Sequence, residues 1–148
     1  VYQGFSAYYS HNTHVAEIAD VVLKDGMPVI KKVTVAVDCG VVVNPTGAIN
    51  QIQGGVLDGI GHAMYSDFSF ENGKPNFKNF DTYRLIRMQE TPKVDVHFIK
   101  SDIKPTGLGE PGLPPAGGAV ANAIHAALGK RLYRQPFIND LKKSTVLG

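Results

Sequence analysis

The sequence predicts an α+β fold, with mostly antiparallel strands and hairpins and two helices packed on them. The first observation is a pair of β-rich runs, Val15–Leu23 and Val29–Val37, joined by a segment that contains Asp25-Gly26. Asp-Gly between two such runs is a strong hairpin signal, because a tight two-residue turn needs positive φ. The other two observations are apolar repeats at steps of three and four, one after Asn44-Pro45 and one over Ala116–Leu128, which are typical of helices.

The remaining strands are predicted from shorter β-rich runs. Val1–Ser10 precedes the first hairpin, and Val94–Ile99 has apolar residues at alternate positions. Tyr65–Phe70 and Pro75–Phe80 flank a segment with an Asn-Gly turn, which predicts a second hairpin. The tail from Tyr133 to Gly148 has no clear pattern, so no element is predicted there.

The two helices have recognisable ends. Asn44 is the expected N-cap of the first helix, with Pro45 at its first position, and Gly129 is the expected stop of the second. The first helix also contains four glycines, each of which costs up to about 1 kcal/mol relative to Ala in a helix interior. They predict that something packs very closely against this helix. The apolar stripes are Ile49, Ile52, Val56, Ile60 and Ala63 in the first helix and Val120, Ile124, Ala127 and Leu128 in the second; the four glycines are Gly54, Gly55, Gly59 and Gly61.

Composition narrows the class of protein. The 148 residues form one domain by size, and 43% of them are hydrophobic, as in soluble globular proteins. No apolar run reaches the roughly 18–20 residues of a membrane span. The net charge of +2 and the scattered basic residues disfavour a nucleic-acid-binding surface. Cys39 is the single cysteine, which excludes an intramolecular disulfide and a cysteine-rich metal site in this chain. Because the chain begins at Val1 without Met, we expect a piece of a longer protein.

The strongest candidate for chemistry is Glu110, in the run Gly107-Leu108-Gly109-Glu110-Pro111-Gly112. Prolines stiffen this loop and glycines let other groups approach it closely, just before the second helix. One interpretation is a general base, whose pKa would be raised in a dry pocket so that it takes a proton near neutral pH. The other interpretation is a surface carboxylate that caps or approaches the helix beginning near Pro115. Pattern alone leaves both open.

A second candidate is the glycine-rich stretch around Gln51 and Gln53. It is either a helix packed tightly on a sheet or a place where an amide and bare backbone approach a planar cofactor. It matches neither a P-loop nor a Gly-x-Gly-x-x-Gly fingerprint. The five histidines show no ligand spacing, so a metal site made of protein side chains is not predicted, and Cys39 is interpreted as a buried small residue.

Several short motifs occur together in a specific order. Val37-Asp38-Cys39-Gly40 is followed by Asn44-Pro45, Gln51-Ile52-Gln53-Gly54-Gly55, the Glu110 loop, and Ala119-Val120-Ala121-Asn122-Ala123-Ile124. In this order the chain resembles the C-terminal end of the molybdopterin-binding large subunit of the xanthine oxidase and aldehyde oxidase superfamily. Within that superfamily it is most similar to the isoquinoline 1-oxidoreductase β-subunit branch. The likeness runs from about Gly4 to Pro136.

The resemblance implies a mechanism and a set of site residues. Glu110 would be the general base that takes a proton from a metal-bound hydroxyl in the hydroxylation, with water as the oxygen source, of an N-heterocyclic (isoquinoline-like) or aldehyde carbon. Hydride would pass to the molybdenum sulfido group. Molybdenum would be held by the pterin rather than by side chains, which implies no protein metal ligand. The residues implied to bind the cofactor are Gln51, Gly54, Gly55, Gly109, Gly117, Gly118, Ala119 and Val120.

The resemblance also implies partners. They are the rest of the large subunit, a small subunit that carries iron–sulfur clusters, and a small-molecule substrate, with the pterin in its cytosine dinucleotide form. We expect this C-terminal piece, residues 1–148 of a molybdopterin-binding domain, to be inactive alone. A non-catalytic α+β binding or assembly module that kept the fold is the alternative. The compartment stays open between cytoplasm and periplasm.

Overall fold

The computed structural model describes residues 1–145, with side-chain surroundings for residues 1–142, and it confirms the α+β fold. Strands β1 (Tyr2–Ser10), β2 (Thr13–Lys24) and β3 (Met27–Asp38) form an antiparallel meander. Strand β6 (Lys93–Phe98) completes the order β1-β2-β3-β6 and runs parallel to β3. The sheet is therefore mixed at its β6 edge. A parallel neighbour needs a long crossover, and here the chain between β3 and β6 includes helix α1.

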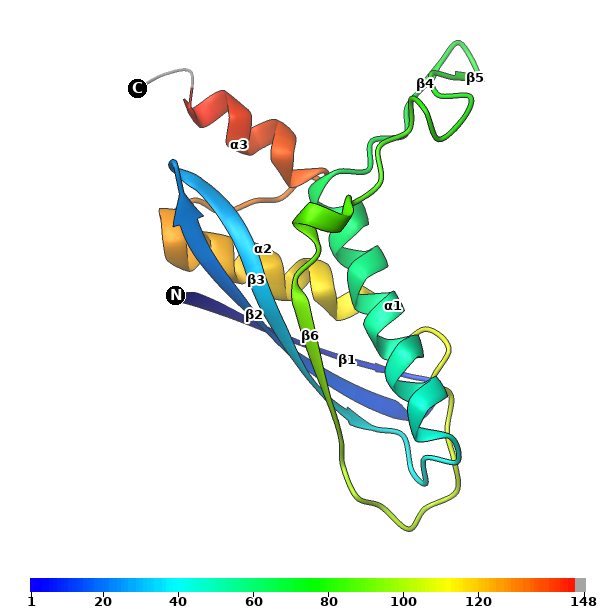
Figure 1. The fold of residues 1–148 in the computed structure, drawn as a ribbon. Coiled ribbons are helices and arrows are strands. Elements are labelled where there is room, and N and C mark those ends of the chain that lie inside the picture. The colour runs from blue at the N-terminus through cyan, green and yellow to red at the C-terminus, as the bar shows by residue number, and fades with distance from the viewer. Residues whose placement is uncertain (146–148) are drawn as a thin grey trace.

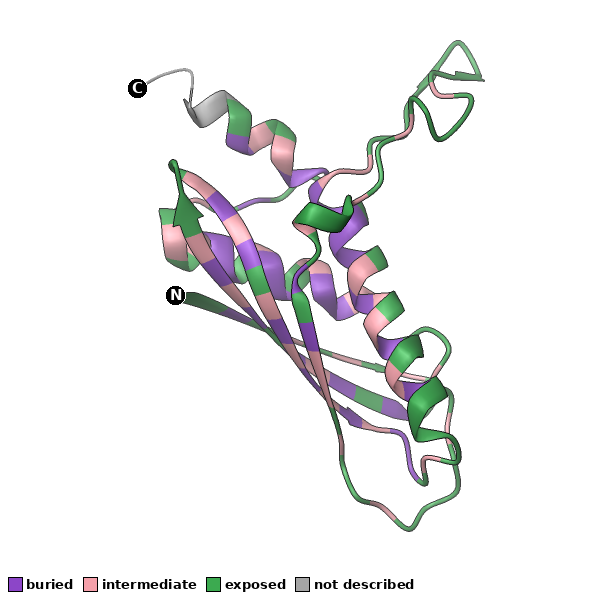
Figure 2. Cartoon of the chain, in the orientation of Figure 1, coloured by how far each residue is buried: buried purple, intermediate pink, exposed green. Residues whose placement is uncertain are grey.

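One face of the sheet carries the core. Side chains alternate between buried and less buried along β2 and β3, as Figure 2 shows, because successive residues of a strand point to opposite faces. Helix α2 (Pro114–Leu128) packs across β1 and β2, and helix α1 (Pro45–Met64) lies beside α2 and β6 (Figure 1). The largest fully buried apolar side chains are Ile52, Ile60 and Ile124, all from the helices.

The predicted ends of the first hairpin and of both helices are confirmed. Asp25 and Gly26 have φ of 52° and 75°, the values that a tight hairpin turn requires. The side chain of Asn44 accepts a hydrogen bond from the Gly47 amide at 3.0 Å and caps α1. Gly129 ends α2 with φ of 66°.

The glycines of α1 follow the prediction only in part. A Cβ on Gly59 would lie 2.4 Å from the Leu113 carbonyl oxygen, so α1 and the start of α2 meet there without room for a side chain. Gly55 and Gly61 have ordinary contacts, whose nearest atoms would be 3.4 Å from a Cβ. Close packing is wrong for Gly54, where a Cβ would meet nothing within 4 Å among the described residues.

A third helix was not expected from the sequence. Helix α3 (Phe137–Thr145) occupies part of the tail in which no element was predicted. It anchors through Phe137 and Leu141, which are both buried. Two apolar anchors in a nine-residue helix are too few to make a recognisable repeat. In α2 the end of the predicted stripe is also displaced, since Leu128 is 38% exposed.

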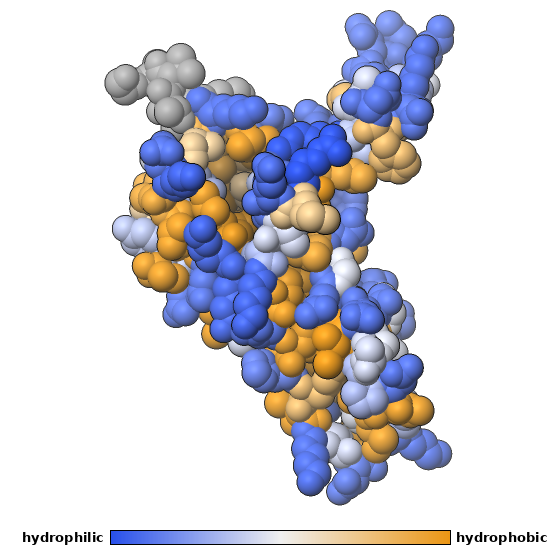
Figure 3. All heavy atoms as spheres, viewed as in Figure 1, coloured by the Kyte–Doolittle hydropathy of each residue, from blue (hydrophilic) through white to orange (hydrophobic). Residues whose placement is uncertain are grey.

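The second hairpin exists, but its predicted strands are too long. Strands β4 (Phe70–Glu71) and β5 (Lys74–Pro75) have two residues each, and Tyr65 ends α1 instead of starting a strand. The β4–β5 hairpin forms the end of an arm that projects from the body of the molecule in Figure 1. The end of this arm is hydrophilic in Figure 3. Nearer the body, the rings of Phe68, Phe77 and Tyr83 pack on one another, with centroids 5.8–6.2 Å apart. Aromatic residues here build a small cluster rather than strands. The short 3₁₀ helix Met88–Glu90 leads back to β6.

None of the helices formed by residues 1–145 has the length and apolar character needed to cross a membrane.

Candidate functional site

The candidate site lies where the loop before α2 meets the outer side of α1. Glu110 is exposed on this loop, and its backbone carbonyl accepts a hydrogen bond from the Leu113 amide at 2.9 Å. Helix α2 begins at Pro114 with Leu113 as its N-cap, and no side chain caps it. Glu110 is therefore not a capping residue. The dry pocket expected around its carboxylate is not formed by residues 1–145 of this chain.

Gln51 connects α1 to the Glu110 loop. Its side-chain Nε2 donates a hydrogen bond to the carbonyl oxygen of Gly109, the residue directly before Glu110. The Gln51 side chain is exposed. The two strongest candidates from the sequence, Gln51 and Glu110, are thus brought to one place although they belong to different elements.

Two glycines at this place have open space where a side chain would be. A Cβ on Gly54 or on Gly109 would meet nothing within 4 Å in the described part of the chain. Gly55 instead faces the backbone of Gly112 and Leu113. Beside the loop lies a hollow of about 320 Å³, lined in part by Asn44, Gly47, Ala48, Gln51, Pro105 and Gly109. Bare backbone and the amide side chains of Asn44 and Gln51 therefore border this hollow, and Glu110 directly follows Gly109 at its edge.

The candidates on α2 have a different environment. Ala119 and Val120 are fully buried in the core. A Cβ on Gly118 would lie 2.7 Å from the Ser6 hydroxyl, and one on Gly117 would lie 3.3 Å from the Gln135 side-chain nitrogen. Packing inside the chain therefore accounts for these small residues, and a contact between them and a cofactor stays a prediction. Gly117 and Gly118 also border a second hollow, of about 420 Å³, with Tyr133 and Gln135.

Side chains suited to binding a metal are dispersed. Among residues 1–145, no group of three or more His, Cys, Asp or Glu side chains could hold a metal ion. His11 lies in the β1–β2 turn with φ of 54°. Cys39 is buried as expected, and burial, followed by the charge of Asp38, raises the pKa of its thiol.

Two buried polar residues escaped the sequence analysis. Thr13 is fully buried and hydrogen-bonds to the Glu110 loop. Glu17 is also fully buried, and its carboxylate oxygens have no hydrogen-bond partner among the described residues. Burial raises its pKa to about 8, so this side chain is mostly protonated at neutral pH. Glu17 lies between Val15 and Ala19 on the same face of the strand, so the alternation of the sequence could have indicated a buried acid there. A threonine at the start of a strand gives no such signal.

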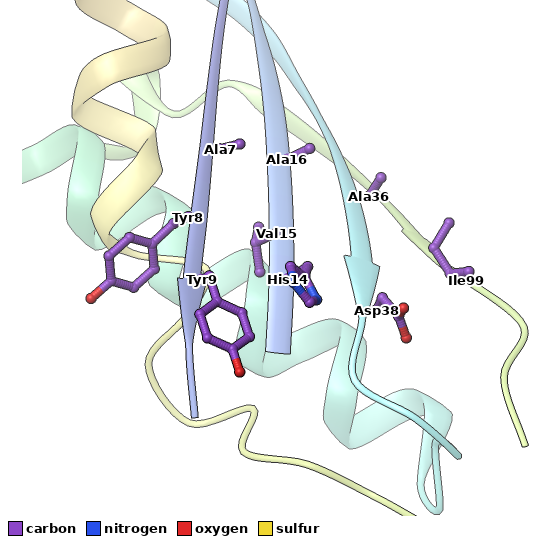
Figure 4. Close-up of a pocket in the computed structure, with 9 residues that line it drawn as sticks. All are labelled: Ala7, Tyr8, Tyr9, His14, Val15, Ala16, Ala36, Asp38 and Ile99. Carbon is purple, nitrogen blue, oxygen red and sulfur yellow. The ribbon is translucent and has the colours of Figure 1, made fainter. Parts of the chain in front are cut away.

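The outer face of the sheet contains a separate hollow of about 410 Å³, shown in Figure 4. Ala7, Ala16 and Ala36 form its floor across three strands. The rings of Tyr9 and His14 stand at one end with centroids 4.5 Å apart. This hollow lies on the sheet face away from the helices, so it is distinct from the space beside Gln51 and Gly109.

Comparisons with known proteins identify the family of the chain. Residues 2–92 match the model of the molybdopterin cofactor-binding domain. The chain is 40% identical, over 75% of its length, to a membrane-bound aldehyde dehydrogenase [pyrroloquinoline-quinone] of Gluconacetobacter polyoxogenes. It is 29% identical, over 90% of its length, to the β subunit of isoquinoline 1-oxidoreductase of Brevundimonas diminuta.

The fold also matches a solved structure. Quinoline 2-oxidoreductase from Pseudomonas putida 86 superimposes on 91% of the chain with a TM-score of 0.76 at 18% identity. This chain covers only 18% of that structure's chain, and 14% and 18% of the two curated relatives. The likeness therefore concerns a small part of much longer proteins.

Proposed function

Because this chain belongs to the molybdopterin cofactor-binding domains of the xanthine oxidase family, we propose that it is the C-terminal part of the large subunit of a molybdenum hydroxylase. The observation that carries this proposal is the hydrogen bond from Gln51 to the Gly109 carbonyl. It joins the glycine-rich face of α1 to the loop of Glu110. The bond thereby holds the Gln51 amide beside the residue that directly precedes Glu110.

The residues around this hydrogen bond fit a planar cofactor. Gly54 and Gly109 have no neighbour among the described residues in the space that a Cβ would fill. Gly54 lies inside α1, where a glycine costs up to about 1 kcal/mol relative to Ala, so its presence there calls for a compensating contact. The side-chain amide of Gln51 has two hydrogens, and only one is donated to the Gly109 carbonyl. Gln51 would orient the cofactor with the other. Gly55, whose neighbours belong to its own chain, would contribute less. When bound, the molybdenum cofactor supplies the two-electron oxidation of a substrate carbon with oxygen from water.

Glu110 would be the general base. A carboxylate that takes a proton must lie within hydrogen-bond reach of it, and the rigid Gly-Glu-Pro-Gly loop fixes where this carboxylate can lie. Glu110 is exposed on this chain, so other parts of the large subunit would have to cover it and exclude water.

The names of the relatives support a proposal about the kind of carbon that is oxidised, and not about one particular substrate. Their names include an aldehyde dehydrogenase and an isoquinoline 1-oxidoreductase. We therefore propose an electron-poor carbon, in either an aldehyde or an N-heterocyclic ring, as the site of hydroxylation. A small subunit with iron–sulfur clusters would accept the electrons, and the pterin would be the cytosine dinucleotide form.

The test is the metal content of the full-length subunit that contains this chain, purified from its native host with its partners. We expect about one molybdenum per large subunit, and iron in a chain that purifies with it. The same preparation would be assayed for pyrroloquinoline quinone, which the name of one relative mentions. Folded full-length protein without molybdenum would contradict the proposal and favour a non-catalytic binding or assembly module.

A further inference from the structure

The loop that carries Glu110 is attached to the end of the sheet by hydrogen bonds. The Thr106 amide donates to the Cys39 carbonyl at 2.9 Å, and the Gly107 amide donates to the His11 carbonyl at 3.1 Å. The two backbones are in direct contact here, because a Cβ on Gly107 would lie 2.5 Å from the Cβ of His11. The β1–β2 turn therefore supports the loop from one side.

Thr13 makes the side-chain part of this attachment. Its hydroxyl oxygen lies 2.6 Å from the Gly107 carbonyl oxygen and 2.7 Å from the Thr106 hydroxyl oxygen. A hydroxyl has one hydrogen to donate, so Thr13 donates to the Gly107 carbonyl and accepts from Thr106. Both bonds are satisfied at a residue with no exposed surface. Losing the Thr13 hydroxyl would remove both of these hydrogen bonds and so release the loop from the start of β2, which is unfavourable.

The loop is thus held at two backbone carbonyls that are separated by one residue. Thr13, on β2, holds that of Gly107, and Gln51, on α1, holds that of Gly109. Glu110 follows directly. We propose that Thr13 is a positioning residue for Glu110, fixing the loop so that the carboxylate stays at one place. This inference rests on the proposed function, because it takes Glu110 as the base.

The experiment uses the full-length enzyme with its partner subunit. Thr13→Val keeps the shape of the side chain and removes its hydroxyl, while Thr13→Ser keeps the hydroxyl. Thr34→Val is the matched control, since Thr34 is a half-buried threonine of β3 on the other sheet face. Three quantities are measured for each variant: kcat per bound molybdenum, KM, and amide hydrogen exchange in the peptide covering residues 105–112.

We expect Thr13→Val to lower kcat by about 10- to 100-fold, as small misplacements of a catalytic group do, with KM and molybdenum content unchanged. Hydrogen exchange in the loop should become faster. Thr13→Ser should resemble the wild type in all three, and so should Thr34→Val. The inference is overturned if Thr13→Val keeps wild-type kcat and exchange, or if Thr13→Ser is as impaired as Thr13→Val.

A second pair of variants covers the case in which Thr13→Val does not fold. If Thr13→Val does not accumulate as folded enzyme, Thr13→Cys is compared with Thr13→Ser, because the two side chains have similar size and differ mainly in hydrogen-bonding strength. Loop exchange reports on Thr13 whether or not Glu110 is a base. Retention of activity in Glu110→Gln would contradict the proposed function. Unchanged loop exchange in Thr13→Val, with Glu110→Gln inactive, would contradict the role of Thr13 and leave the proposed function standing.

Discussion

At the scale of single residues, the site depends on side chains that are far apart in sequence. Gln51 reaches a carbonyl 58 positions away, and Thr13 reaches one 94 positions away. No atom of the described part of the chain fills the space beside Gly54 and Gly109, and the proposed function gives this space to the cofactor. Small residues in a helix thus have two distinct origins here, internal packing at Gly59 and an outward-facing space at Gly54.

Gly54→Ala tests this distinction. The new methyl group has room within the chain, so we expect the free energy of unfolding to stay the same or rise by up to about 1 kcal/mol. If the space belongs to the cofactor, the molybdenum content of the full-length enzyme should fall. Unfolding by denaturant and metal analysis on the same preparation measure both. Full molybdenum content in a folded Gly54→Ala enzyme would show that the space is not a cofactor contact.

Glu17 gives a pH-dependent prediction. Its pKa is about 8 in the folded chain and 4.5 as its ordinary value, so the folded state keeps a proton that the unfolded state has lost. As pH rises from 4.5 to 8, this group should lower stability by roughly 1.4 kcal/mol per pH unit, with no further change above the folded pKa. Below pH 4.5 it should have no effect.

The measurement for Glu17 is denaturant unfolding between pH 5 and 8, on the wild type and on Glu17→Gln. The glutamine variant keeps the shape of the side chain but cannot titrate. Its free energy of unfolding should therefore lack the fall with pH, roughly 1.4 kcal/mol per pH unit, that Glu17 contributes in the wild type. Identical slopes in the two proteins would mean that Glu17 is ionised in the folded state.

At the scale of elements, the sequence was most informative where a local rule decides the structure. The Asp25-Gly26 turn, the Asn44 cap and the Gly129 stop were all predictable, because each depends on one or two residues. Helix α3 was not predictable, since it is held by tertiary contacts of two apolar residues, and neither was the parallel pairing of β6. The link between Thr13 and the Glu110 loop depends on tertiary packing, so no local pattern could indicate it.

The contact between α1 and the start of α2 should be sensitive to one methyl group. Gly59→Ala would place a Cβ 2.4 Å from the Leu113 carbonyl oxygen and 2.9 Å from the Ala116 side chain. Overpacking of this kind typically costs about 1–3 kcal/mol. The free energy of unfolding should therefore fall relative to Gly54→Ala, the same substitution in the same helix. Equal stability of the two variants would contradict the close approach described here.

At the scale of the whole molecule, the proposed function requires this chain to supply one side of a site. Glu110, Gln51 and Gly109 are exposed, and the hollow beside them is open to solvent. The chain also covers 14% and 18% of the two curated relatives. Both facts favour a site that is completed by segments of a longer subunit.

The isolated 148-residue chain should therefore lack activity. Because a single side of a site buries little of a ligand, we expect no retained molybdenum after purification and no hydroxylation of N-heterocycles or aldehydes. Metal analysis and an oxygen-incorporation assay on the purified chain check this. Hydroxylation by the isolated chain would mean that the site is complete without further segments.

The most direct test of the account is the turnover of Glu110→Gln in the molybdenum-loaded full-length enzyme, with Glu71→Gln as the matched control at an exposed acid of the hairpin. Glutamine keeps the shape of the side chain but cannot accept the proton. We predict normal molybdenum content and a loss in kcat of at least about 100-fold for Glu110→Gln, with no change for Glu71→Gln. Wild-type turnover in Glu110→Gln at full metal loading would contradict the account, and Glu110 would then be an ordinary carboxylate of a loop.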